Sequence, residues 1–161
     1  KKPEIQNLEN IAEFSGQLAK NLPTLLKGII EFSEIENTLS ESILTGALSG
    51  LIKYISVDID THYDQVIEFE GRKLRPDLLL HQDNINVVVE VKMVPLTRAA
   101  KLARSVKLHN QLHSYARGTS SAAAIAVLFP TEMSSNEVPQ FVVSDAGQEG
   151  IPFFIIHPMP K

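Results

Sequence analysis

The run Val87-Val88-Val89 constrains the fold of this chain more than any other feature of its sequence. Neighbouring side chains of a strand point to opposite faces, so three valines in a row make both faces of a strand at 86–93 apolar. Such a strand is typical of the centre of a sheet that is covered on both sides. The apolar segment from Ala122 to Phe129 has the same character and predicts a second central strand.

Apolar residues at helical spacing, together with start and stop signals, predict three helices, at about residues 4–20, 34–55 and 97–117. Pro23 ends the first of them, because proline breaks a helix. The sequence Ser33-Glu34-Ile35-Glu36 has the form of a capping box and begins the second. Thr97 is a suitable N-cap for the third, and Gly118 stops it.

Alternating and apolar segments predict further strands at about residues 57–70, 74–81, 141–143 and 153–157. The chain therefore contains helices, then a β-meander, then a helix and more strands. This order predicts an α/β fold, a sandwich in which helices pack on the faces of a mixed sheet. We expect a main domain at 33–161, preceded by a helical extension at 1–32, the two forming one compact unit.

Positive charge is concentrated in one part of the chain. The net charge is −4, yet the segment from Lys92 to Arg117 holds six of the 15 Lys and Arg residues and no Asp or Glu. An acid-free helix is suited to contact the phosphates of a nucleic acid. Arg98, Lys101 and Arg104 recur every three residues, and we predict that they bind nucleic acid. A solvated helix face without a ligand is the alternative.

Several classes of protein are disfavoured by the composition. The chain has no cysteine, which excludes disulfides and thiolate metal sites and fits a reducing compartment. It has no apolar run of about 18 residues, the length that a membrane-spanning helix needs. The residues that follow Lys1 contain no apolar segment that would act as a signal peptide. We therefore expect a cytoplasmic protein without a membrane partner. The chain does not begin with Met, which is expected of a processed product or of a domain from a larger protein.

Asp77, Glu90 and Lys92 are the residues on which a prediction of chemistry depends. A hairpin around Asp83-Asn84 would bring Asp77 and Glu90 to neighbouring strands, and Glu90 and Lys92 share one face of their strand. Two carboxylates suit a hard divalent cation, which neutralises charge on phosphoryl oxygens. The Val91 carbonyl is a candidate further ligand, and a lysine can assist the attacking water.

The sequence Pro76-Asp77 followed by Glu90-Val91-Lys92 resembles the signature of the PD-(D/E)XK nuclease superfamily, also called restriction-endonuclease-like. The resemblance covers roughly residues 34–130. It implies an α/β/α sandwich with a central mixed sheet and a deoxyribonuclease that uses Mg²⁺ or Mn²⁺. Asp77 and Glu90 would be the metal ligands, and Lys92 would be catalytic.

Two further matches to this superfamily flank the signature. The helix before the sheet often supplies an acidic residue near the metal, and Glu41 is the first candidate, with Glu36 and Glu34 as alternatives. Gln111 and Tyr115 resemble the Q-x-x-x-Y element of RecB-type nucleases, and their i, i+4 spacing puts them on one helical face. The resemblance implies that Gln111 helps to place the lysine or the DNA and that Tyr115 contacts the nucleic acid.

The hypothesis from sequence is a metal-dependent nuclease in restriction, defence or DNA repair, with DNA favoured over RNA as the substrate. One alternative is a non-catalytic nucleic-acid-binding or protein-interaction module of the same fold. Another is the nuclease domain of a larger multi-domain machine, and a homodimer is left open. At the residue level, Asp77 as a turn residue, a structural Glu90–Lys92 pair and a buried Tyr115 are the competing interpretations.

Overall fold

A computed structural model describes residues 7–36, 39–63, 65–134 and 136–160, and the side chains of these residues other than 32–36. The helices are α1 (Ile11–Glu36), α2 (Glu41–Ile55), the short 3₁₀ turn η1 (Leu96–Arg98), α3 (Ala99–Ala103) and α4 (Val106–Gly118). The strands are β1 (Asp60–His62), β2 (Ile67–Phe69), β3 (Arg72–Leu74), β4 (Leu78–Gln82), β5 (Ile85–Val94), β6 (Ala123–Pro130), β7 (Phe141–Gln148) and β8 (Ile151–Pro158).

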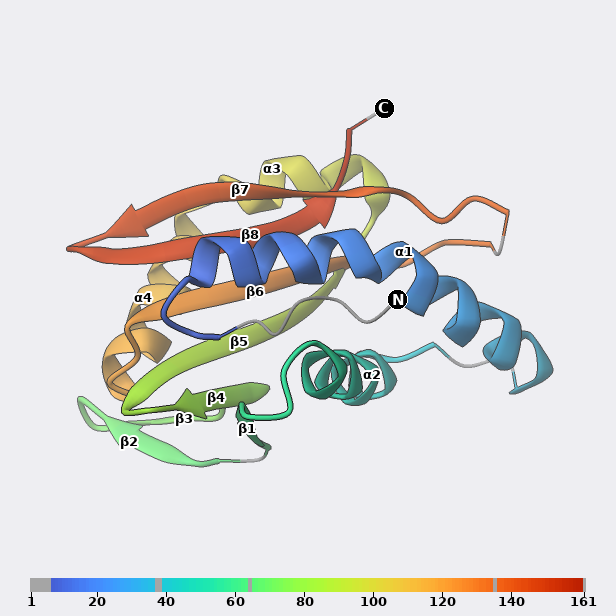
Figure 1. Ribbon diagram of the computed structural model, residues 1–161. Coiled ribbons are helices and arrows are strands. Elements are labelled where there is room, and N and C mark those ends of the chain that lie inside the picture. Colours follow the sequence, from blue (N-terminus) through green and yellow to red (C-terminus); the bar gives the residue numbers. More distant parts are fainter. Residues whose placement is uncertain (1–6, 37–38, 64, 135, 161) are drawn as a thin grey trace.

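Six strands form one central sheet in the order β1-β4-β5-β6-β8-β7 (Figure 1). β5 pairs with β6 and β6 with β8 in parallel, whereas β1–β4, β4–β5 and β7–β8 are antiparallel. β2 and β3 form a separate hairpin outside this sheet. The predicted α/β class with a central mixed sheet is confirmed. The single strand predicted at 57–70 is wrong, because the chain leaves the sheet after β1 and enters the β2–β3 hairpin.

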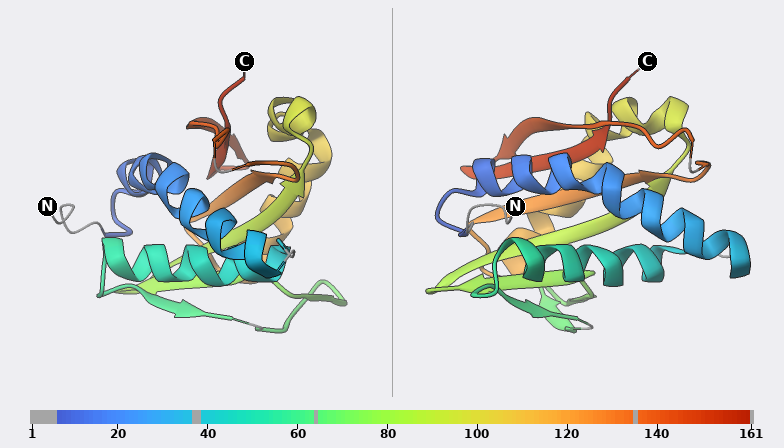
Figure 2. Two further views of the ribbon diagram at one scale, coloured as in Figure 1. Left: turned by 90° about the vertical axis from the view of Figure 1, so that its right-hand side faces the viewer. Right: turned by 45° about the vertical axis from the view of Figure 1, so that its right-hand side comes forward.

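Helices cover both faces of the sheet, as the valine run predicts (Figure 2). Val87, Val89 and Val91 of β5 belong to one hydrophobic core with α1 and α2. Val88 and Val94 of the same strand belong to a second core with α3 and α4. The centre of β5 is therefore buried on both sides, and Glu90 lies within this buried part.

The first helix is longer than the sequence predicts. Pro23 lies inside α1, which continues to Glu36 and changes direction along its length (Figure 1). Proline removes one helical hydrogen bond and bends the helix, and burial of Leu22 and Leu26 against the sheet offsets this cost. The capping box predicted at 33–36 is also wrong. Ser40 caps α2 instead, and its side chain accepts a hydrogen bond from the Ile43 N–H at 3.2 Å.

The helix predicted from Thr97 to Arg117 is divided into η1, α3 and α4. Ser105 caps α4 by accepting a hydrogen bond from the Leu108 N–H at 3.1 Å, so the N-cap predicted at Thr97 is wrong for this helix. α4 does end at Gly118, but the left-handed backbone conformation comes two residues later, at Ser120 with φ of 52°. Within the described residues, no helix combines the length and the apolar content needed to span a membrane.

A tight turn sets the register between β4 and β5. Asp83 and Asn84 have φ of 48° and 68°, the positive values that two-residue hairpin turns require. The resulting ladder pairs Leu78 with Val89, which leaves Asp77 beside Glu90 at the end of the ladder. The hairpin predicted around Asp83-Asn84 is thus confirmed, and it determines where the candidate site forms.

Candidate active site

Asp77 and Glu90 are joined by two hydrogen bonds at the point where the β4–β5 ladder ends. The Asp77 N–H donates to Glu90 Oε1 at 3.2 Å, and the Val91 N–H donates to Asp77 Oδ2 at 2.7 Å. The Asp77 carboxylate thus accepts the hydrogen bond that a backbone carbonyl of β4 would accept if the ladder continued. This arrangement holds both carboxylates beside the backbone of β5.

The backbone of Val91 also points toward Asp77. In a strand, the N–H and C=O of one residue point to the same neighbouring strand, and the Val91 N–H points to Asp77. Continuing the register places Pro76 opposite Val91, and proline has no N–H to donate. The Val91 carbonyl is therefore directed toward the two carboxylates, next to a residue that cannot bond to it.

Glu90 is buried, with 4% of its surface exposed. Burial raises the pKa of Glu90 to about 8, and the negative charge of Asp77 contributes to this increase. The positive charge of Lys92 acts in the opposite direction, so the lysine lies within electrostatic reach of the carboxylate. The structure therefore brings together the three residues that the sequence singles out.

Glu41 approaches this group from the beginning of α2. Burial raises the pKa of Glu41, the charge of Asp77 raises it further, and the charge of Lys92 lowers it. Glu41 therefore faces both residues across the gap between α2 and the sheet. The side chains of the alternatives, Glu34 and Glu36, lie outside the described residues.

A divalent cation fits the chemistry of these donors. Burial raises the pKa values of Glu41 and Glu90, repulsion by the charge of Asp77 raises them further, and a bound cation would offset that repulsion. The acidic side chains of the site do not closely surround one point. The described residues contain no group of three or more His, Cys, Asp or Glu in metal-binding proximity. An open arrangement of this kind suits Mg²⁺, which is typically held by one or two carboxylates and keeps several waters.

α4 forms the opposite side of the site. Burial raises the pKa of the Tyr115 hydroxyl, the nearby charge of Glu90 adds to this, and a side-chain hydrogen bond with Gln111 acts against it. Gln111 and Tyr115 also line the same cleft as Lys92. The two residues of the predicted Q-x-x-x-Y element therefore line one cleft with Lys92, and Tyr115 lies within electrostatic reach of Glu90.

Two clefts contain residues of the candidate site. One has a volume of about 510 Å³ and lies between α4 and the β2–β3 hairpin, with Lys92, Gln111 and Tyr115 in its wall. The other, of about 370 Å³, is lined by residues of α2, the segment before β4, and the exposed Tyr63, and it includes Glu41 and Asp77. Each cleft therefore gives access to different members of the candidate site, Lys92 in the first and Asp77 in the second.

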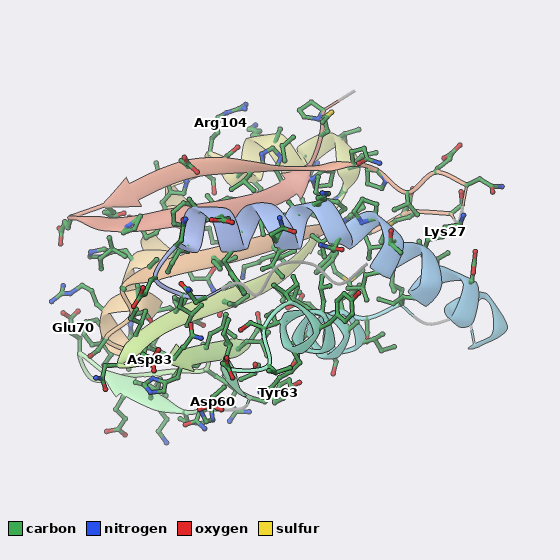
Figure 3. The ribbon with its side chains drawn as sticks, viewed as in Figure 1. Lys27, Asp60, Tyr63, Glu70, Asp83 and Arg104 are labelled. Carbon is green, nitrogen blue, oxygen red and sulfur yellow. The ribbon has the colours of Figure 1, made fainter. Side chains whose placement is uncertain are left out.

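Arg98, Lys101 and Arg104 do not join this group. Arg98 and Lys101 line a separate pocket at η1 and α3. Arg104 lies close enough to His157 of β8 for its charge to lower the pKa of that histidine, for which burial is the larger cause. In Figure 3, Arg104 lies at the top of the molecule, and Asp60 of β1 lies at the bottom. β1 is an edge strand of the central sheet.

Sequence reasoning missed the cations that do line the larger cleft. Arg72 and Lys73 belong to β3, and Lys107 belongs to the first turn of α4. Arg72 and Lys73 fall between the strands predicted at 57–70 and 74–81 and outside the acid-free segment, so the sequence analysis assigned them no role. Lys107 continues the three-residue spacing of the acid-free segment, but the prediction named only Arg98, Lys101 and Arg104.

No family model matches the chain, and no curated protein matches it. Among solved structures, the chain is similar to one described as a refined half-complex from the tetradecameric assembly of Thermococcus gammatolerans McrB AAA+ hexamers with bound McrC. The TM-score is 0.51 and the sequence identity is 13%. The match covers 72% of this chain and 27% of that chain, so this chain corresponds to about a quarter of the neighbour. At this identity, the similarity is one of fold alone.

Proposed function

We propose that this chain is a divalent-metal-dependent nuclease of the PD-(D/E)XK type, with a restriction-endonuclease-like fold, that hydrolyses phosphodiester bonds of DNA. The observation that carries the proposal is the pairing of Asp77 with the buried Glu90 beside Lys92. Burying a carboxylate next to a second carboxylate costs free energy unless a cation or proton compensates for it. A catalytic metal ion bound by both carboxylates would offset this cost.

Each residue has a role that its position suits. Asp77, Glu90 and the Val91 carbonyl would hold Mg²⁺ or Mn²⁺, and Glu41 would add negative charge from α2. When bound, the ion neutralises charge on the phosphoryl oxygens and lowers the pKa of water. The Lys92 ammonium orients the attacking water and stabilises the negative charge that develops during attack.

Gln111 and Tyr115 act from α4. Their hydrogen bond restricts the Tyr115 hydroxyl, which lies within electrostatic reach of Glu90. We assign Gln111 a positioning role, in which it keeps the tyrosine and the entering strand in place. Tyr115 offers a ring and a hydroxyl to the nucleic acid.

A non-catalytic nucleic-acid-binding or protein-interaction module of the same fold is the main alternative. Such a module would have no need for two adjacent carboxylates at the end of a buried strand. It predicts DNA or protein binding with no cleavage and no dependence on a divalent cation. Cleavage assays therefore separate the two functions.

A second candidate is a nuclease that works as one domain of a larger machine. The structurally similar region is 27% of a chain from an assembly that contains AAA+ hexamers, and this supports the candidate. If target selection resides in other domains, the chain alone will cut unrelated DNA sequences at similar rates. A strong sequence preference of the isolated chain would contradict it.

Cleavage of plasmid and linear DNA tests the proposed function. We expect cleavage with Mg²⁺, none with EDTA, and a loss of about 10²-fold or more in Asp77→Ala and Lys92→Ala, because each removes a group that acts in the transition state. Lys27→Ala is the matched control, since Lys27 is an exposed lysine on α1 (Figure 3). Wild-type rates in both site variants, with normal thermal unfolding, would refute the proposal. RNA of the same sequence tests the preference for DNA.

A further inference from the structure

The cleft between the β2–β3 hairpin and α4 is strongly basic. Its charged residues are Arg72 and Lys73 of β3, Lys92 of β5 and Lys107 of α4, and its lining contains no acidic residue. Lys92 has a role in the proposed reaction. The other three cations have none, although they lie in the same cleft of about 510 Å³.

In the part of the chain that the structure describes, Arg72, Lys73 and Lys107 form no ion pair, whereas the charge of Lys92 acts on Glu90 and Glu41. Among the described residues, the ion pairs are His113 with Glu149 and Arg117 with Glu70. None of the cleft's four cations takes part in either pair. Uncompensated positive charge in a cleft attracts an anionic ligand.

The hairpin is fixed on the C-terminal end of α4. A Cβ at Gly118 would lie 2.9 Å from Leu74 Cδ1 and 3.2 Å from Phe69 Cβ, so a larger residue there would require these side chains to shift. The Arg117 guanidinium lies 5.3 Å from the centre of the Phe69 ring, and it also pairs with Glu70 at 3.8 Å. The cations of β3 are therefore held at a fixed distance from α4.

The cleft contains Lys92, Gln111 and Tyr115 of the candidate site. Tyr115 lies in its wall. Burial and the charge of Glu90 raise the pKa of Tyr115, while the charge of Arg72 lowers it. The tyrosine thus lies within electrostatic reach of both the hairpin and the candidate metal site. A chain of phosphates along the cleft would pass from the hairpin to Lys92.

We propose that the β2–β3 hairpin and α4 are two walls of a backbone-binding cleft, in which Arg72, Lys73 and Lys107 hold phosphates that neighbour the bond to be cut. The inference rests on the proposed function and names the surface that positions its substrate. The cations are exposed and spread along an open cleft, which suits a polyanionic strand better than a single phosphate. This cleft takes the place of the surface at Arg98, Lys101 and Arg104 as the main contact with nucleic acid.

Binding measurements without cleavage test this inference. Fluorescence anisotropy of a labelled DNA oligonucleotide is measured in Ca²⁺ and in EDTA over a range of salt concentrations. Three double variants each remove two positive charges, namely Arg72→Ala/Lys107→Ala in the cleft, Arg98→Ala/Lys101→Ala at α3, and Lys20→Ala/Lys27→Ala on α1. The α1 pair is the matched control, because both lysines are exposed on a helix that does not line the cleft.

We expect the cleft variant to bind about tenfold or more weakly. Its plot of log affinity against log salt should become shallower by about two, roughly one for each lost phosphate contact. The α3 and α1 variants should remain within about twofold of the wild type. In cleavage assays, the cleft variant should raise KM more than it lowers kcat, because it loses uniform binding of the strand.

The outcomes separate this inference from the proposed function. Wild type that binds DNA through the cleft but does not cut it refutes the nuclease and leaves the cleft in place. Wild type that cuts DNA, with equal affinity losses in the cleft and α1 variants or a larger loss in the α3 variant, overturns the cleft. Wild type that fails to bind DNA at low salt also overturns it.

Discussion

The surroundings of Glu90 strongly change the acid–base chemistry of its side chain. The sequence predicts that a carboxylate between two valines of a central strand needs a partner. The structure supplies the Asp77 N–H as a donor, but it also brings the Asp77 carboxylate close. One hydrogen bond does not compensate for burial and repulsion together. The raised pKa of Glu90 is the consequence.

This raised pKa has a testable effect on stability. Between the usual pKa of a glutamate, 4.5, and about 8, the folded chain keeps a proton on Glu90 that the unfolded chain releases. The free energy of unfolding should therefore decrease as pH rises through this window, by an amount on the order of a few kcal/mol. Urea unfolding in EDTA at several pH values measures it.

Glu90→Gln is the matched variant, because glutamine cannot titrate. Its stability should lack the decrease that the wild type shows over the same window. His157 titrates with the opposite sign, since burial lowers its pKa, and the wild-type-minus-variant difference removes that contribution. Identical pH dependence in the two proteins would mean that Glu90 is not perturbed.

At the scale of elements, the segment after β5 decides which cations reach the site. Its sequence is compatible with one continuous helix. Such a helix would contain both Gln111 and the cations Arg98, Lys101 and Arg104. The break at Ser105 separates α3 from α4. α3 then packs against β6 and β8, away from the carboxylates. Helical periodicity does not report such a break, because both halves keep the same pattern.

The docking of the β2–β3 hairpin on α4 depends on one glycine. Gly118→Ala should lower the free energy of unfolding by about 1–3 kcal/mol, since the added methyl group meets Leu74 and Phe69 at less than normal contact distance. It should also weaken DNA binding, because the hairpin carries Arg72 and Lys73. Chemical denaturation and the anisotropy assay measure the two effects.

Gly50→Ala is the control for this variant. Gly50 lies in α2, and a Cβ there has no atom within 4 Å. Replacing it should raise the free energy of unfolding by about 0.5–1 kcal/mol, as expected for glycine in a helix. Equal effects of the two substitutions would show that the contact at Gly118 does not hold the hairpin.

At the scale of the whole molecule, the features that the sequence predicts correctly are those that depend on residues close together in the chain. The valine run correctly predicts the central strand, and Asp83-Asn84 correctly predicts the hairpin that brings Asp77 to Glu90. Both rest on local rules of side-chain alternation and turn geometry. The predicted convergence of the carboxylates follows from them.

The features that the sequence does not predict depend on contacts between distant segments. α1 buries Phe14 and Leu18 in the same core as α2 and the sheet, although its pattern shows only that one face is apolar. The basic cleft lies between the β2–β3 hairpin and α4, which pack together at Phe69 and Gly118, and no spacing rule links those residues. Tertiary packing also carries α1 past Pro23. Such packing is invisible to periodicity within a single element.

A crystal structure of the chain soaked in Mn²⁺ tests the central claim most directly. The account predicts an anomalous peak between the Asp77 and Glu90 carboxylates, within reach of the Val91 carbonyl, and its loss in Asp77→Ala crystals. The arrangement of donors at the end of the β4–β5 ladder is the reason for this expectation. Absence of Mn²⁺ from this position, at a concentration that saturates the crystals, would contradict the assignment of a metal-dependent active site.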